Sequence, residues 1–130
     1  MRAEQLAISS VSNRPNDLET ILAAYEGAGF VNVEFTLKHV YDYLEIGHTL
    51  QDVERLLRGH GLTCIGGFES VVTCFASEEE QVQNHNRIVD NCRLLAELGG
   101  SSLVMGTDGP DQTQECVDPI GEIAGVMGKL

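Results

Sequence analysis

The fold of this chain is decided by one stretch, Ala23-Ala24-Tyr25-Glu26-Gly27-Ala28-Gly29-Phe30-Val31-Asn32-Val33-Glu34-Phe35. An amphipathic run ends there in glycine, and a short apolar strand begins almost at once. The same junction recurs at residues 56–68 and 94–105. Glycine after a helix supplies the left-handed backbone that turns the chain into the next strand. The repeat therefore predicts an α/β fold in which crossover helices join parallel strands.

The size and charge of the chain limit the number of domains and the kinds of partner that it can have. Its 130 residues predict a single domain, residues 1–130, that can bury a core of its own. Twenty acidic and eight basic residues give a net charge of −12. This charge argues against nucleic acid and against anionic membrane surfaces, because both are bound through lysine and arginine. No apolar run approaches the ~20 residues of a membrane span. We expect no nucleic-acid partner and no membrane partner.

The cysteines indicate a reducing compartment. Cys64, Cys74, Cys92 and Cys116 contain no C-x-x-C pair, so we predict neither a disulfide nor a structural zinc site. We expect Cys64 and Cys92 to behave as small buried apolar residues. The start Met1-Arg2-Ala3-Glu4 does not resemble a signal peptide. A cytoplasmic location is therefore expected.

Four strand–helix units are predicted along the chain. The expected strands are 6–11, 31–36, 63–68 and 101–105. The expected helices are 18–27, 49–59, 77–98 and 117–130. Residues 37–47 and 70–76 are interpreted as loops. Thr49 with Asp52, and Ser77 with Glu80, have the spacing of capping boxes. On the later helices we place Val82, Cys92 and Ile120 on the inward faces.

Candidate site residues lie at the carboxyl ends of the predicted strands, where parallel α/β folds gather functional groups. Glu34 sits between Val33 and Phe35, and Glu69 follows Phe68. Each is either a glutamate in contact with solvent or an acid, base or hydrogen-bonding group at the mouth of the site. If the two face one cleft, their like charges raise one pKa and favour proton transfer. We take Glu34 and Glu69 as catalytic candidates.

Three further residues are candidates for substrate binding. Ser10 ends the first strand, His39 lies in the region interpreted as the loop after the second, and Asp108 follows the fourth. No two histidines have the i, i+4 spacing of a metal pair, and no G-x-G-x-x-G follows the first strand. The residues thus indicate no metal site and no cofactor.

The segments Asp17–Leu22 and Gly29–Phe35 resemble the xylose-isomerase-like family of sugar phosphate isomerases and epimerases. Gly61–Thr63 and Cys92–Gly99 look like later units of the same family. The resemblance implies a TIM (β/α)8 barrel, of which this chain matches the N-terminal half. It also implies that Glu34 is the family's second-strand glutamate near the substrate mouth, with His39 a looser match. Members commonly hold a divalent metal, Mn or Mg, through the last four strands, so a metal is expected only for the complete barrel.

Half a barrel leaves its inner face open and both sheet edges unpaired. We therefore expect a (βα)4 half barrel completed by dimerisation, with the fourth strand of each copy pairing with the first strand of the other. The primary functional hypothesis is a sugar phosphate isomerase/epimerase-like protein that stops before the metal-binding strands and is inactive alone. One alternative is an active isomerase, epimerase or lyase whose site forms across the homodimer. Another is a non-enzymatic module with an open, doubly wound sheet that binds a small sugar-like ligand.

Overall fold

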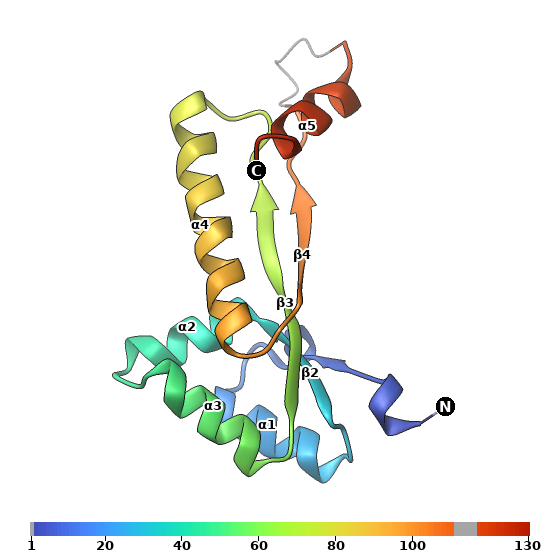
Figure 1. Ribbon diagram of the computed structural model, residues 1–130, viewed down its shortest axis with the longest axis vertical. Helices are drawn as coiled ribbons and strands as arrows, with labels where there is room; N and C mark the ends of the chain where they lie inside the picture. Colours follow the sequence, from blue (N-terminus) through green and yellow to red (C-terminus); the bar gives the residue numbers. More distant parts are fainter. Residues whose placement is uncertain (1, 111–116) are drawn as a thin grey trace.

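The computed structural model describes residues 2–110 and 117–130, without the side chains of Ala3 and Glu69. A parallel sheet holds four strands in the order β1-β2-β3-β4 (Figure 1). The strands are β1 (Ile8–Ser9), β2 (Asn32–Thr36), β3 (Thr63–Val72) and β4 (Ser102–Thr107). The α-helices are α1 (Leu18–Gly27), α2 (Leu37–Glu45), α3 (Leu50–Gly59), α4 (Glu78–Glu97) and α5 (Pro119–Met127). Short 3-10 helices cover Ala3–Gln5 and Ser10–Asn13.

Glycine turns the chain from helix to strand at each of the three predicted junctions. Gly29, Gly61 and Gly99 follow α1, α3 and α4 with φ of 80°, 62° and 88°. These angles lie in the left-handed region that glycine adopts without a steric penalty. The repeat that defines the fold class is confirmed.

The helices cover one face of the sheet. Val33 and Phe35 of β2 are fully buried in a core cluster with residues of α1, α2, α3 and α4. A second cluster joins Val72, Ile88 and Val126, so α5 packs on this helical face as well. On the other face Val71 and Val104 are 51% and 47% exposed. In the part of the chain that the structure describes, no helix covers these residues, and this side of the sheet is named the open face. The doubly wound alternative, with helices on both faces, is therefore wrong.

The strands are staggered in one direction. The pairing register places Ser9, Glu34, Gly66 and Ser102 in one row. Ser9 is the last residue of β1, whereas Ser102 is the first residue of β4. A sheet that closes into a barrel needs this cumulative offset. The sheet thus has the geometry of an arc of a barrel.

A helix replaces the loop predicted after the second strand. Residues Leu37–Glu45 form α2 and place His39 on a helix. Leu37, Val40, Tyr41 and Leu44 have the i, i+3, i+4, i+7 spacing of an inward stripe. The density of polar and aromatic residues concealed this period, so the loop interpretation was wrong.

Strand lengths also differ from the predictions. β1 is shorter than predicted, because the chain enters a 3-10 helix at Ser10. β3 continues past Phe68 to Val72, so the expected loop at 70–76 begins later. β4 extends to Thr107 and leaves Asp108 just beyond its end.

Three side chains predicted to face inward are exposed. Val82 on α4 is 55% exposed and Ile120 on α5 is 79% exposed. Cys92 is exposed as well, whereas Cys64 is buried as expected. The inward stripe of α4 instead contains Ile88, Asn91 and Leu95. A polar Asn91 at a core position shifts the apparent apolar face toward Cys92.

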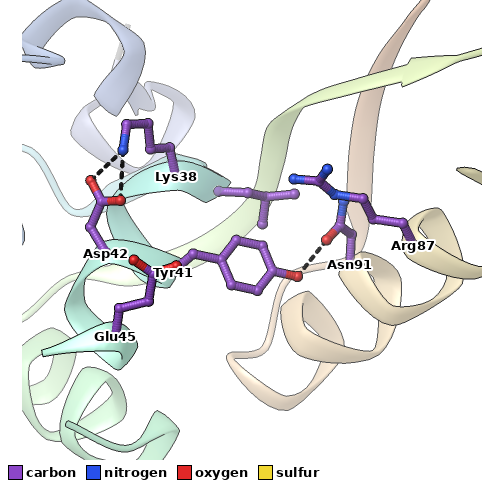
Figure 2. Close-up of a pocket in the computed structure, with 7 residues that line it drawn as sticks. Lys38, Tyr41, Asp42, Glu45, Arg87 and Asn91 are labelled. Carbon is purple, nitrogen blue, oxygen red and sulfur yellow. Dashed lines mark hydrogen bonds and ion pairs between the residues drawn. The ribbon is translucent and has the colours of Figure 1, made fainter. Parts of the chain in front are cut away.

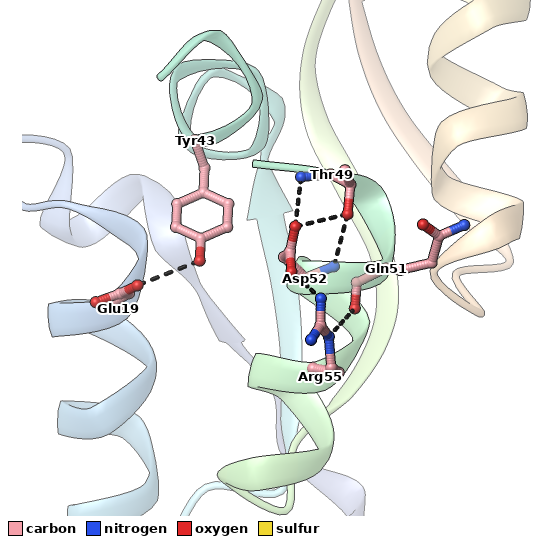
Figure 3. A network of polar contacts seen from close by, with 6 residues as sticks. All are labelled: Glu19, Tyr43, Thr49, Gln51, Asp52 and Arg55. Atoms are coloured by element: carbon pink, nitrogen blue, oxygen red, sulfur yellow. Dashed lines mark hydrogen bonds and ion pairs between the residues drawn. The ribbon is translucent and has the colours of Figure 1, made fainter. Parts of the chain in front are cut away.

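Both predicted capping boxes are confirmed. Thr49 and Asp52 exchange hydrogen bonds at the start of α3, and Ser77 and Glu80 do so at α4. Figure 3 shows the first box, in which Arg55 also contacts Asp52. In the same region the Tyr43 hydroxyl of α2 donates to Glu19 of α1 at 3.2 Å. Burial and this carboxylate raise the pKa of Tyr43.

Candidate functional site

Glu34 lies on the open face in the middle of the sheet. It follows Val33 and precedes Phe35, both on the helical face, so strand alternation turns its side chain the other way. It is partly exposed, and among residues 2–110 and 117–130 no hydrogen bond or ion pair engages its carboxylate. A carboxylate in this position is available to a ligand.

The row that contains Glu34 consists of small and polar residues. Its neighbours in register are Ser9 on one side and Gly66 on the other. A Cβ at Gly66 would collide with the backbone oxygen of Ser102, so the close approach of β3 and β4 requires glycine there. The buried Ser9 Oγ and Thr36 Oγ1 have no partner within the part of the chain that the structure describes. Such hydroxyls are usually satisfied by ordered water.

Glu69 lies at an irregularity in β3. The register with β4 shifts between Phe68 and Ser70, which makes Glu69 the extra residue of a bulge. Its side chain is outside the described part of the structure. The expected meeting of Glu34 and Glu69 in one cleft stays a prediction.

Ser10 and His39, predicted separately, are joined. His39 Nδ1 lies 3.0 Å from Ser10 Oγ, and His39 Nε2 lies 3.4 Å from the carbonyl oxygen of Arg14. The carbonyl only accepts, so Nε2 carries the proton, and in the neutral ring Nδ1 accepts from the Ser10 hydroxyl. The Thr36 N–H donates to Ser10 Oγ at 2.7 Å. Ser10 and His39 are buried, at 0% and 4% exposure, and their contact connects the end of β1 to the start of α2.

Asp108 fixes the loop after β3. Its carboxylate accepts hydrogen bonds from the N–H groups of Cys74 and Phe75 at 2.6 and 3.3 Å. Its own N–H donates to the carbonyl oxygen of Val72 at 3.2 Å. Burial and the Asp108 charge raise the pKa of the Cys74 thiol. Asp108 stands six residues beyond Ser102, or roughly 20 Å along β4 from the row of Glu34 at about 3.3 Å per residue.

A separate cavity of about 550 Å³ lies between α2 and α4 (Figure 2). The residues that line it are Leu37, Lys38, Tyr41, Asp42, Glu45, Arg87 and Asn91. The Tyr41 hydroxyl donates to Asn91 Oδ1 at 2.6 Å, and Asn91 Nδ2 donates to Ser70 Oγ at 2.8 Å. The sequence analysis did not predict this cavity. Its sequence signal is the polar Asn91 within the inward stripe of α4.

The described residues do not form a metal site. Among them, no group of three or more histidine, cysteine, aspartate or glutamate side chains could hold a metal ion. They therefore do not fit the divalent ion that the resemblance implies for a complete barrel.

No helix in the described ranges is long and apolar enough to cross a membrane.

The comparisons with known proteins define the fold. No protein family model matches the chain, and no curated protein does. Among solved structures, the chain is similar to a xylose isomerase-like TIM barrel/4-hydroxyphenylpyruvate dioxygenase fusion protein, with a TM-score of 0.68 and 17% sequence identity. The match covers 95% of this chain and 19% of that chain. The chain thus has the fold of part of a TIM barrel, and it spans about a fifth of the protein that it matches.

Proposed function

We propose that this chain binds a sugar or a similar polyol on its open face, as a sugar phosphate isomerase/epimerase-like half barrel. The observation that carries the proposal is the partly exposed carboxylate of Glu34, which lies in a polar row and has no partner among the described residues. Sugar hydroxyls both donate and accept, and a carboxylate is a strong acceptor for them. The similarity in fold to a xylose isomerase-like barrel supports this ligand class.

In this proposal Glu34 accepts a hydrogen bond from a ligand hydroxyl. Gly66 keeps β3 and β4 close together beside Glu34, because a Cβ at that position would collide with Ser102. Ser10 and His39 position the end of β1 next to this row. Catalysis would need further groups, and Glu69 and Asp108 are the candidates of this chain.

Titration with D-xylose, D-glucose and glucose 6-phosphate, followed by amide chemical shifts, tests the proposal. We expect shifts to cluster at Ser9, Glu34, Gly66 and Ser102. Glu34→Gln should weaken binding about tenfold or more, because hydrogen bonds to charged groups contribute roughly 1.5–3 kcal/mol. Glu97→Gln, an exposed glutamate at the end of α4, is the matched control and should leave affinity unchanged. Shifts confined to the α2–α4 cavity, or equal affinities of the two variants, would contradict the proposal.

One observation bears on the alternative of an active isomerase, epimerase or lyase. Asp108 follows the end of β4, which is the strand displaced furthest along the stagger of the sheet. Asp108 is too far along β4 to act with Glu34 of its own chain. In an arrangement that brings these two kinds of group together, Asp108 would come from a second copy.

A further inference from the structure

We infer that two copies of this chain close one eight-stranded barrel, and that each site combines Glu34 of one copy with Asp108 of the other. The edges and the open face of the sheet support the dimer. The shared site rests on the proposed function, because it needs a ligand at Glu34.

The two edges of the sheet are compatible with each other. All four strands are parallel, and β1 and β4 form the edges. When β4 of one copy pairs with β1 of a second copy, and the reverse, all eight strands stay parallel around a twofold axis. Edges that present unpaired N–H and C=O groups favour this kind of pairing.

The open face supplies apolar residues for the closed interior. Val71 and Val104 are 51% and 47% exposed on that face. Phe68, the register partner of Val104, is partly exposed beside it. Closing the barrel removes these side chains from water, which is the main driving force for association. The apolar content and the parallel edges both favour a second copy over a small ligand as the cover of this face.

The stagger predicts the register between the copies. A closed eight-stranded barrel of this type has a shear of about eight residues, or about four for each of two identical halves. Within one copy, the row of register partners that begins at Ser9 of β1 ends at Ser102 of β4. An offset of about four residues then pairs Gly106 with Ser9 of the second copy, and Met105 with Ile8 of the second copy. Met105 and Ile8 both contact core clusters, so the offset keeps the helical face continuous.

This register brings Asp108 toward the second copy's Glu34. Gly106 lies in the same row as Glu34 of the second copy, because that Glu34 pairs with its own Ser9. Asp108 is two residues further along β4, and β2 of the second copy is two strands away. At about 3.3 Å per residue and 4.8 Å between strands, Asp108 then lies roughly 12 Å from Glu34 of the second copy. Within one chain the same two positions are more than roughly 20 Å apart. A bound sugar with its two carboxylate partners spans the shorter distance.

Sedimentation of the purified 130-residue chain tests the dimer. We expect a dimer, with Val104→Glu and Val71→Glu each weakening association at least tenfold while the far-UV spectrum stays unchanged. Val82→Glu introduces the same change at an equally exposed valine on the outer side of α4 and should leave the dimer intact. A wild-type monomer, a larger oligomer, or equal effects of all three variants would overturn the inference.

A mixing experiment tests the shared site. Glu34→Gln and Asp108→Asn are each expected to lose most binding of the sugar found in the titration. Random exchange between the two variants should restore roughly a quarter of the sites, because each mixed dimer then holds one intact pair. A site within one chain would show no restoration. Val104→Glu provides a second readout, since it should lose sugar binding together with the dimer.

The outcomes separate the two proposals. A dimer that binds no sugar leaves the closed barrel standing and contradicts the proposed function. A monomer that binds sugar at Glu34 supports the proposed function and overturns the dimer.

Discussion

Asn91 joins three elements through a single side chain. It is 3% exposed on α4, accepts from Tyr41 of α2 and donates to Ser70 of β3. Ser70 reaches Asn91 because the bulge at Glu69 moves it to the helical face. Buried polar groups that are fully paired specify one arrangement of the surrounding elements. Asn91 therefore sets the position of α2 and α4 around the cavity between them.

Asn91→Leu should destabilise the protein by about 1–3 kcal/mol, because Ser70 Oγ is left buried without its partner. Thermal or urea unfolding measures the change. Asn86→Leu, an exposed asparagine on the same helix, is the control and should stay within about 0.5 kcal/mol of wild type. Equal effects of the two variants would show that the hydrogen bonds of Asn91 do not contribute to the stability of the fold.

At the scale of elements, local rules act strongly at the helix ends. The boxes Thr49–Asp52 and Ser77–Glu80 satisfy backbone N–H groups at the starts of α3 and α4. Hydrogen bonds from the Thr49 and Ser77 side chains, followed by backbone bonds, lower the pKa of Asp52 and Glu80. A carboxyl whose pKa is lower in the folded state stabilises the protein above its unfolded pKa. The stabilisation is lost as the pH falls through the folded pKa.

The melting temperature should accordingly fall as the pH drops below about 4.3, the ordinary value for glutamate. Glu80→Gln should show a shallower fall over this acid range, because one capping carboxylate no longer titrates. Glu79→Gln, in the same first turn but outside the box, should follow the wild-type curve. A Glu80→Gln curve that is parallel to wild type would contradict the role of the cap.

The sequence alone predicts the elements whose signal is local. The glycine junctions, the capping boxes and the parallel order follow from residues close together in the chain. α2 was missed because its apolar stripe is interleaved with Lys38, Asp42 and other polar residues. The contact of Ser10 with His39 depends on how β1 and α2 pack, across 29 residues of sequence. The α2–α4 cavity likewise depends on the bulge in β3, which has no local sequence signal.

At the scale of the whole molecule, charge opposes the association that the open face favours. Each copy has a net charge of −12, so two copies repel one another at low ionic strength. The proposed interface is formed by strand edges and by apolar residues such as Val71 and Val104. Salt should therefore strengthen the dimer, because it screens the repulsion without weakening apolar contacts.

Sedimentation at increasing sodium chloride concentration tests this balance. We expect the dissociation constant to decrease several-fold from low salt to about 0.5 M, where the screening length is a few ångströms. Sodium sulfate at equal ionic strength should act at least as strongly, since it also favours apolar burial. A dimer that dissociates as salt is added would indicate an interface held by ion pairs.

The two halves of β3 have different partners, and this affects how the chain unfolds. Thr63–Phe68 pair with β2, and Gly66–Val72 pair with β4. The two core clusters share the partly buried Leu103, and among the described residues the second cluster has four buried members. Sub-global opening is therefore expected to begin around the second cluster, where α5 packs, while the larger cluster remains folded, because regions with few buried contacts open at low free energy. The end of β4 that is proposed to pair with the second copy lies in this region, because Met105 packs on the second cluster. Dimer formation should therefore suppress this opening and protect the amide hydrogens there from exchange.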